Sequence, residues 1–417
     1  KALAMKLDKY SITQSSKSIE TLAKEFSQYA ENYGEEVGQI YWKETDSAVA
    51  SKMDLKAYAK SRMISFVSND YLGLSQHPQV QSDAIRAINQ FGTGFCAAPS
   101  VGGYSSLQKR LEEGLSKLLH TEDTLVFNSG LSANIELLSA LLKPDDIVFL
   151  DEGVHRSLFE CVKHGTCKVL PHNDPEALES ALQRYNGEGR NRYVVMDEVY
   201  SQDGDRGLVR EYLEISQRYG ALLVVDDAHG IGVLGETGGG LLEELGLLGA
   251  VPLVTGTLSK AFGSIGGYVS GRKELVEYIR YYAGSCCFSV SLPPPCLAAA
   301  LRSLELIQKA TFERKELLDK AQEIYLIQEE LAWLNVSVVQ AAFDDMKKQT
   351  GYDINKYEPL LKELFRLEKK GFQGIYSGEE QAIADARKAL KYKHKILLGN
   401  TLLDTNKIVA ARFKLGM

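Results

Sequence analysis

The stretch TGTLSKAFGSIGG, Thr255–Gly267, contains the most informative lysine of the chain. Lys260 follows two hydroxyl residues and precedes a glycine-rich turn, at the end of a short apolar run that begins at Leu253. A lysine desolvated in such a position can lose its proton and form a Schiff base with an aldehyde. Thr257 and Ser259 could hold a phosphate, because the nearby glycines let the backbone approach closely. A structural turn with an ordinary surface lysine is the alternative interpretation of this stretch taken alone.

Short apolar runs surround this stretch between about residues 120 and 290. They are Thr124–Phe127, Ile147–Leu150, Tyr193–Met196, Ala221–Val225, Leu253–Thr255 and Gly267–Ser270. Helical patterns lie between several of them, at Leu131–Leu142, Glu176–Tyr185 and Leu208–Tyr219. Continuous apolar runs separated by helices indicate buried, largely parallel strands with right-handed crossovers. The sequence therefore predicts a central α/β layer.

The two ends of the chain differ from this central part. Apolar residues at helical spacing over Ser18–Tyr33 predict an amphipathic helix. Cys296–Gln308 and Phe312–Trp333 predict long helices, and a strand signal returns only at Ile408–Phe413. We expect three parts: an N-terminal helical segment over 1–65, a large domain over 66–295 and a small C-terminal α+β domain over 296–417.

Composition excludes several classes of protein. The 417 residues include 48 basic and 55 acidic side chains, and this net charge of −7 argues against a nucleic-acid surface. No apolar run is long enough to span a membrane, and no secretory signal is present. The 6 cysteines form neither a disulfide framework nor paired zinc knuckles, so we expect a cytoplasmic protein without a metal site.

Two further strand ends carry groups suited to an aromatic cofactor. Ala221–Val225 leads into Asp226, and an acidic side chain at a strand's carboxyl end can pair with a protonated pyridine nitrogen. His229 could lie near the phenolic oxygen of such a ring. After another strand, His155 offers an imidazole that could stack on the ring, although a lone histidine is more often structural. Helix capping is the alternative role for Asp226.

The loop FNSGLSAN, Phe127–Asn134, joins a strand to a helix, where backbone N–H groups can bind phosphate. Four strand-end loops thus offer a phosphate cradle, a stacking ring, a nitrogen partner and a lysine. In this order and spacing they resemble the loops of fold-type I enzymes that use pyridoxal 5'-phosphate (PLP), and in particular the α-oxoamine synthase family. The resemblance extends from about Ser68 to Ile307. Its blocks are Ser68–Leu74, Phe91–Gly94, Leu111–Glu112, His172–Asp174, Tyr200–Asp205, Asp226–His229, Thr257–Gly263 and Phe288–Pro294.

The resemblance implies an aspartate aminotransferase-like large domain with a mainly parallel sheet, PLP as cofactor, and three catalytic residues. Lys260 would bind PLP covalently, Asp226 would pair with the pyridine nitrogen, and His155 would stack on the ring. Further cofactor contacts are implied for Ser129, Gly130, Leu131, Ser201, His229, Thr257 and Ser259. Asn69 would help to seat the amino-acid carboxylate. The segment Phe288–Pro294 would reach across a homodimer.

The chain also departs from the family pattern. Pro99, Tyr104 and Gln108 stand where relatives often have arginine, threonine and histidine near the substrate entrance. An anionic acyl tail would lack a charged partner there, which favours a neutral acyl group. Val290 replaces a frequent hydroxyl residue. Arg412 is the candidate carboxylate anchor of the C-terminal part, and a surface charge is its alternative role.

The resemblance implies an acyltransferase that joins an α-amino acid to an acyl thioester, releasing CO₂ and free thiol and leaving an α-amino ketone. The thioester would be carried by coenzyme A or by an acyl-carrier protein. The chain begins at Lys1 and not at Met, which is compatible with excision from a multidomain synthase that includes a carrier domain. Another fold-type I enzyme, such as an aminotransferase or an aldolase-type lyase, and a non-catalytic scaffold subunit are the alternatives.

Overall fold

The computed structural model describes most of the chain between residues 17 and 398. The described residues are 17–32, 44–48, 50, 52–55, 63–65, 67–160, 166–187, 191–202, 204–332, 336–346, 354–370 and 380–398. By its contacts the chain divides into two compact units, Lys1–Ser68 and Asn69–Met417. The domain boundaries expected from the sequence, at 65/66 and 295/296, stay predictions.

The first unit contains helix α2 (Ile19–Asn32) and a short antiparallel pair, β1 (Lys52–Met53) with β2 (Met63–Ile64). The Ser18 hydroxyl accepts a hydrogen bond from the Thr21 amide at 3.3 Å, which fixes the helix start. Leu22 on this helix is buried. The helix predicted over Ser18–Tyr33 is thus confirmed.

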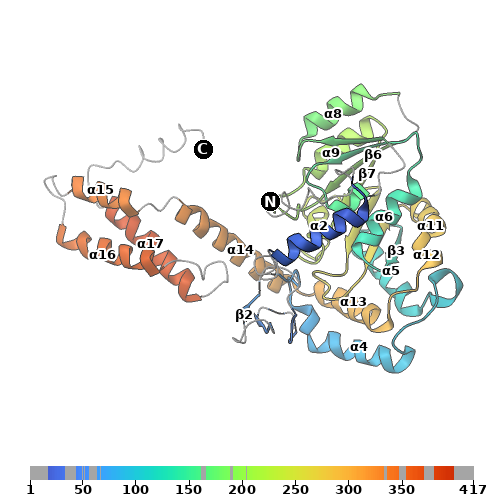
Figure 1. Ribbon diagram of the computed structural model, residues 1–417, viewed down its shortest axis with the longest axis horizontal. Coiled ribbons are helices and arrows are strands. Elements are labelled where there is room, and N and C mark those ends of the chain that lie inside the picture. Colours follow the sequence, from blue (N-terminus) through green and yellow to red (C-terminus); the bar gives the residue numbers. More distant parts are fainter. Residues whose placement is uncertain are drawn as a thin grey trace. The chain divides into compact units, whose positions relative to one another are not determined.

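The second unit is built on a central sheet (Figure 1). The sheet has seven strands in the order β3-β9-β8-β7-β6-β4-β5. The strands are β3 (Asp123–Phe127), β4 (Ile147–Asp151), β5 (Thr166–Leu170), β6 (Arg192–Asp197), β7 (Leu222–Asp226), β8 (Leu253–Thr257) and β9 (Gly267–Gly271). Strands β5, β4, β6, β7 and β8 pair in parallel, and β9 is antiparallel to both β8 and β3. The predicted, largely parallel sheet is confirmed.

Strand β5 is absent from the apolar runs that predicted the other strands. It lies at the edge of the sheet, and most of its side chains are exposed or only partly buried. Its sequence TCKVL is therefore free to carry Lys168, whose charge would not fit in an interior strand.

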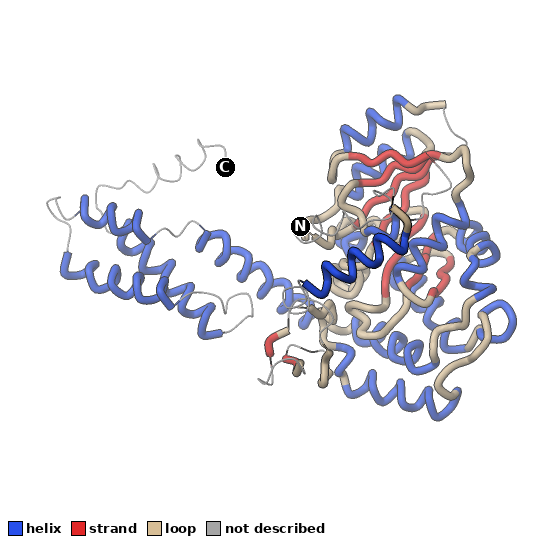
Figure 2. Tube along the Cα trace, in the orientation of Figure 1, coloured by secondary structure: helices blue, strands red, loops and turns tan. Residues whose placement is uncertain are grey.

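Helices cover both faces of the sheet, as Figure 2 shows. They are α4 (Pro78–Phe91), α5 (Ser106–Leu119), α6 (Gly130–Leu141), α7 (Arg156–Glu160), α8 (Pro175–Arg184), α9 (Val209–Arg218), α10 (Gly240–Glu244), α11 (Lys273–Tyr282), α12 (Gly284–Phe288) and α13 (Pro294–Ile307). Short turns of other helix types lie at Leu74–Gln76 and Pro99–Gly103.

Alternate side chains of each central strand enter two different cores. On β4, for example, Val148 and Leu150 pack with α6, whereas Ile147 and Phe149 pack with α8 and α9. Both sets are almost fully buried. Because successive side chains of a strand point to opposite faces, burial of both faces requires the continuous apolar runs seen in the sequence.

The chain continues after α13 as α14 (Thr311–Ala332), α15 (Val336–Met346), α16 (Ile354–Lys370) and α17 (Glu380–Leu398). The last three share a small apolar core that includes Phe343, Leu364 and Ala389, all fully buried. Only helices occur in the described residues after Pro295. The strand expected at Ile408–Phe413 and the candidate anchor Arg412 lie outside the described residues.

Candidate active site

The carboxyl ends of the central strands bring the predicted site residues to one edge of the sheet. Ligands of open α/β sheets bind at this edge. The contributing residues are Ser129 after β3, His155 after β4, Asp226 at the end of β7, and Lys260 after β8.

No helix among the described residues combines the length and apolar character that a membrane span needs.

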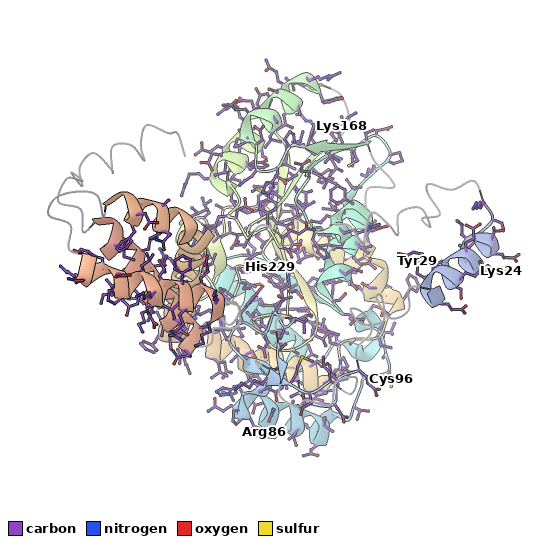
Figure 3. All side chains as sticks on the ribbon, turned by 60° about the vertical axis from the view of Figure 1, so that its left-hand side comes forward. Lys24, Tyr29, Arg86, Cys96, Lys168 and His229 are labelled. Atoms are coloured by element: carbon purple, nitrogen blue, oxygen red, sulfur yellow. The ribbon has the colours of Figure 1, made fainter. Side chains whose placement is uncertain are left out.

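Lys260 lies at the inner end of a short chain of polar groups. Its Nζ is 2.6 Å from Nε2 of His229, which Figure 3 labels, and Nδ1 of His229 is 2.7 Å from the hydroxyl of Tyr71. Burial lowers the pKa of Lys260, because the charged amine is poorly solvated there; the nearby carboxylates of Asp226 and Asp197 oppose this shift without cancelling it. The site thus favours the neutral amine that a Schiff base requires.

The protonation of His229 fits this arrangement. Burial, followed by the charges of Lys260 and His155, lowers the pKa of His229 to about 4, so the imidazole is neutral at pH 7. Burial also raises the pKa of Tyr71, so its hydroxyl keeps its proton and can donate to Nδ1. Nε2 then carries the ring's proton toward Lys260. Tyr71 had no role in the sequence interpretation, although it lies within the block Ser68–Leu74.

Asp226 is a buried acid of the site, only 4% exposed. Its carboxylate accepts hydrogen bonds from Nδ2 of Asn134 at 2.8 Å and from the Ala228 amide at 3.0 Å. Asn134 is itself held by the Thr255 hydroxyl, which donates to its Oδ1 at 2.6 Å. Burial raises the pKa of Asp226, while the bond from Asn134 and the charge of Lys260 lower it in part. The carboxyl group is thus positioned by neighbours on α6 and β8.

Asp197 is a second buried acid that the sequence interpretation missed. It ends β6 and pairs in register with Asp226 on β7. Burial, together with the charge of Asp226, raises the pKa of Asp197 well above its usual range, although the His155 amide donates a hydrogen bond to it. Its Oδ1 has no hydrogen-bond partner among the described residues. The signal in the sequence was the acidic residue directly after the apolar run Tyr193–Met196.

His155 lies next to this pair of acids, since its backbone amide donates a hydrogen bond to Asp197. Its Nδ1 is 2.7 Å from the hydroxyl of Ser157, which also accepts a hydrogen bond from Asn134 at 3.0 Å. The side chain of His155 is exposed, so its ring is free to stack on a bound aromatic group. Two buried acids, an unpartnered acceptor on Asp197 and a lysine of lowered pKa suit a ligand with a cationic ring nitrogen and an aldehyde, which PLP provides.

The start of α6 lies against the end of β8, at the place where the sequence predicts a phosphate cradle. Ser129 caps the N-terminus of α6, because its hydroxyl accepts a hydrogen bond from the Ser132 amide at 3.0 Å. A Cβ on Gly130 would lie 3.0 Å from Thr257, so glycine permits this close approach. The Thr257 hydroxyl already donates to the Gly266 carbonyl at 3.0 Å and accepts from the Ser259 amide at 3.1 Å.

The remaining predicted site residues lie at the surface of the site. Leu131, Ser201, Ser259 and Asn69 have exposed side chains. Leu131 and Ser259 border the cradle through their positions next to Gly130 and Thr257. Ser201 lies in the loop after β6, and Asn69 lies two residues before Tyr71.

Two of the residues expected near a substrate entrance bind an internal acid. The Tyr104 hydroxyl and the Gln108 amide both donate to the buried Glu112, at 2.7 and 3.0 Å. Arg280 lies 3.5 Å from the same carboxylate and 3.1 Å from Asp123. Tyr104 and Gln108, which stand in place of threonine and histidine, thus donate hydrogen bonds to the buried Glu112.

Comparisons with known proteins agree with this geometry. The model of the family "Aminotransferase class I and II" matches residues 61–344. An 8-amino-7-oxononanoate synthase of Citrifermentans bemidjiense is 40% identical over 292 residues, covering 69% of this chain and 72% of that protein. One of Geobacter sulfurreducens is 37% identical, covering 78% of this chain and 83% of that protein.

Solved structures show the same relationship. Serine palmitoyltransferase of Sphingomonas wittichii is 27% identical with a TM-score of 0.69, covering 74% of this chain and 78% of that one. The 8-amino-7-oxononanoate synthase of Francisella tularensis shares the fold, with a TM-score of 0.56 at 21% identity over 79% of this chain and 96% of that one. The chain therefore belongs to the aminotransferase class I and II family and, within it, to the α-oxoamine synthases, with PLP as its cofactor.

Proposed function

We propose that the chain catalyses the PLP-dependent, decarboxylative condensation of an α-amino acid with an acyl thioester. The observation that carries the proposal is a half-buried lysine amine 2.6 Å from a neutral histidine, beside the paired acids Asp226 and Asp197. Relatives named 8-amino-7-oxononanoate synthase and structures of serine palmitoyltransferase support this reaction class.

Bound PLP supplies an electron sink for the negative charge that develops at the α-carbon. Asp226 would keep the pyridine nitrogen protonated through a charge-assisted hydrogen bond. Lys260 would bind the cofactor and, once released, would accept the α-proton, because burial lowers the pKa of its amine. His229 lies within hydrogen-bond distance of that amine and could pass a proton to or from it.

The other contacts of the cofactor are part of the same proposal. His155 would stack on the ring, Ser201 and His229 would lie near its phenolic oxygen, and Asn69 would help to seat the amino-acid carboxylate. The phosphate would bind at the start of α6, where Gly130 and Leu131 offer backbone amides. Ser129, Thr257 and Ser259 would complete this cradle. Thr257 would then have to give up its internal hydrogen bond to Gly266.

We expect the acyl group to be neutral. Pro99 and Gln108 line a small cavity of about 10 Å³ together with Val290, so three of the four departures from the family pattern in this part of the chain lie in one place. This is room for about one water molecule. Arg280 is already bound by Glu112 and Asp123, which leaves it little free charge for an anionic acyl tail.

With one amino acid held constant, acetyl, propionyl or long-chain thioesters are expected to give a kcat/KM at least about tenfold above that of succinyl thioester. The reason is that the succinyl carboxylate would be desolvated without a charged partner. Release of CO₂ and of free thiol measures the reaction. A clear preference for succinyl would disprove the neutral acyl group, and transfer of an amino group without thiol release would indicate an aminotransferase instead.

A homodimer is expected because a run of apolar side chains is left exposed near the substrate entrance. Tyr281, Tyr282, Phe288 and Val290 are 73, 64, 92 and 56% exposed. Burial of these side chains against a second copy would remove them from water. Sedimentation should show a dimer, and Phe288→Asp should shift it toward monomer while lowering activity. A fully active monomer would contradict this prediction.

The carrier of the acyl group, coenzyme A or an acyl-carrier protein, stays a prediction. A cytoplasmic location likewise rests on the sequence alone.

A further inference from the structure

The block His172–Asp174 has no part in the proposed chemistry, yet it joins three strand-end loops. His172 follows β5, and its ring lies between two carboxylates. Nδ1 is 3.0 Å from Oδ1 of Asp151, the last residue of β4. Nε2 is 3.0 Å from Oδ2 of Asp205, in the loop after β6. One imidazole thus connects the ends of β4, β5 and β6.

Asp151 is the fixed end of this connection, since it is only 1% exposed. It accepts hydrogen bonds from the Gly153 amide at 2.8 Å, from the Asn173 amide at 2.6 Å, and from the Tyr212 hydroxyl at 3.4 Å. Because Gly153 lies two residues before His155, the same carboxylate also shapes the loop that carries the proposed stacking ring. A buried carboxylate held so firmly can serve as an anchor.

The loop after β6 is the other end of this connection. Its internal hydrogen bonds run from the Tyr200 amide to the Asp205 carbonyl at 3.0 Å and from the Gly204 amide to the Tyr200 carbonyl at 2.9 Å. Asn173 ties the loop to β5, because its Nδ2 donates to the Arg206 carbonyl at 2.9 Å. Ser201 lies within this loop, so the position of Ser201 depends on what holds Asp205 and Arg206.

Both ring nitrogens of His172 face carboxylate oxygens, and only the doubly protonated imidazolium can donate to both. The other titratable groups around it are Glu152, whose carboxylate accepts from the His172 amide at 3.3 Å, and Tyr200, whose ring lies edge-on at 4.3 Å. Burial alone would lower the pKa of His172, but the hydrogen bonds to Asp151 and Asp205 outweigh it and raise the pKa above the ordinary value.

We propose that His172 is a positioning residue which, as an imidazolium between Asp151 and Asp205, holds the Ser201 loop in place beside the cofactor site. The inference rests on the proposed function only for the roles of Ser201 and His155. A pKa that is raised in the folded state gives a stabilisation present below the ordinary pKa of histidine and lost as the pH rises through the raised value. The loop is therefore expected to loosen at alkaline pH.

The test is amide hydrogen exchange of the peptide 199–208 in the full-length chain, with and without PLP, corrected for the intrinsic effect of pH. In His172→Gln this peptide should exchange about tenfold to a hundredfold faster near pH 6, because two charge-assisted hydrogen bonds are lost. The difference from the wild type should shrink as the pH rises. PLP affinity of the variant should fall about tenfold.

His120→Asn is the matched control. It removes an exposed imidazole at a position of positive φ, where asparagine is well tolerated, and should leave the peptide's exchange unchanged. Wild-type exchange and PLP affinity in His172→Gln would overturn the proposal.

If His172→Gln does not fold, Asp205→Asn carries the test, because Asp205 is partly exposed and the variant removes one charge without changing the shape. Faster exchange of the peptide would support the proposal, and unchanged exchange would overturn it. No substrate is present in these measurements, so they remain valid if the condensation reaction itself is disproved.

Discussion

Lys260→Ala is expected to abolish turnover, by a factor of about 10⁴ or more, and to leave no borohydride-reducible cofactor on the protein. The reason is that Lys260 alone among the described lysines has its amine within 2.6 Å of His229 at the carboxyl edge of the sheet. Burial lowers the pKa of this amine, so it is the nucleophile that PLP would meet. Mass spectrometry after borohydride reduction would identify the modified lysine.

Lys273→Ala is the matched control, because Lys273 is exposed at the start of α11. This variant should keep both the reducible cofactor and the activity. Should the reduced cofactor map to a lysine other than Lys260, the assignment fails.

Asp226→Asn is expected to slow exchange of the substrate's α-proton by two to four orders of magnitude, an estimate of about 10²–10⁴ for a lost acid–base partner. The substitution keeps the shape and an acceptor for Nδ2 of Asn134, but it removes the charge that would hold the pyridine nitrogen protonated. Exchange can be followed by NMR in deuterated water with a single amino acid and no thioester.

Asp319→Asn on α14 provides the control, because it removes one carboxylate whose side chain is exposed. Near wild-type exchange in Asp226→Asn would remove Asp226 from the proposed role. Loss of PLP binding without loss of folding would still agree with it, because the charged hydrogen bond also contributes to affinity.

The sequence predicted the interior of the sheet better than its margin. Val148 and Phe149 on β4 face different cores, and such two-sided burial leaves a continuous apolar run that is visible without any structure. Strand β5 has no such run, because the edge of a sheet tolerates exposed and charged side chains like that of Lys168.

The candidate site was predictable where a residue's chemistry followed from its position at a strand end. Lys260 and Asp226 are of this kind. Asp197 was missed, because its proximity to Asp226 depends on the register of β6 against β7. Tyr71 was given no role, because its contact with His229 joins residues 158 positions apart in the sequence. The spacing of residues along the chain shows neither the register of β6 against β7 nor the contact between Tyr71 and His229.

The pairing of Asp197 with Asp226 also links the stability of the fold to its cofactor. Two carboxylates buried side by side repel each other in the protein alone, and a ring carrying positive charge would relieve that repulsion. A ligand that binds only the native state raises the free energy of unfolding by about 1.4 kcal/mol for each tenfold excess over its dissociation constant. The amount of folded protein in a cell would then follow the supply of PLP, and a mutation that weakens the core could be masked wherever that supply is ample.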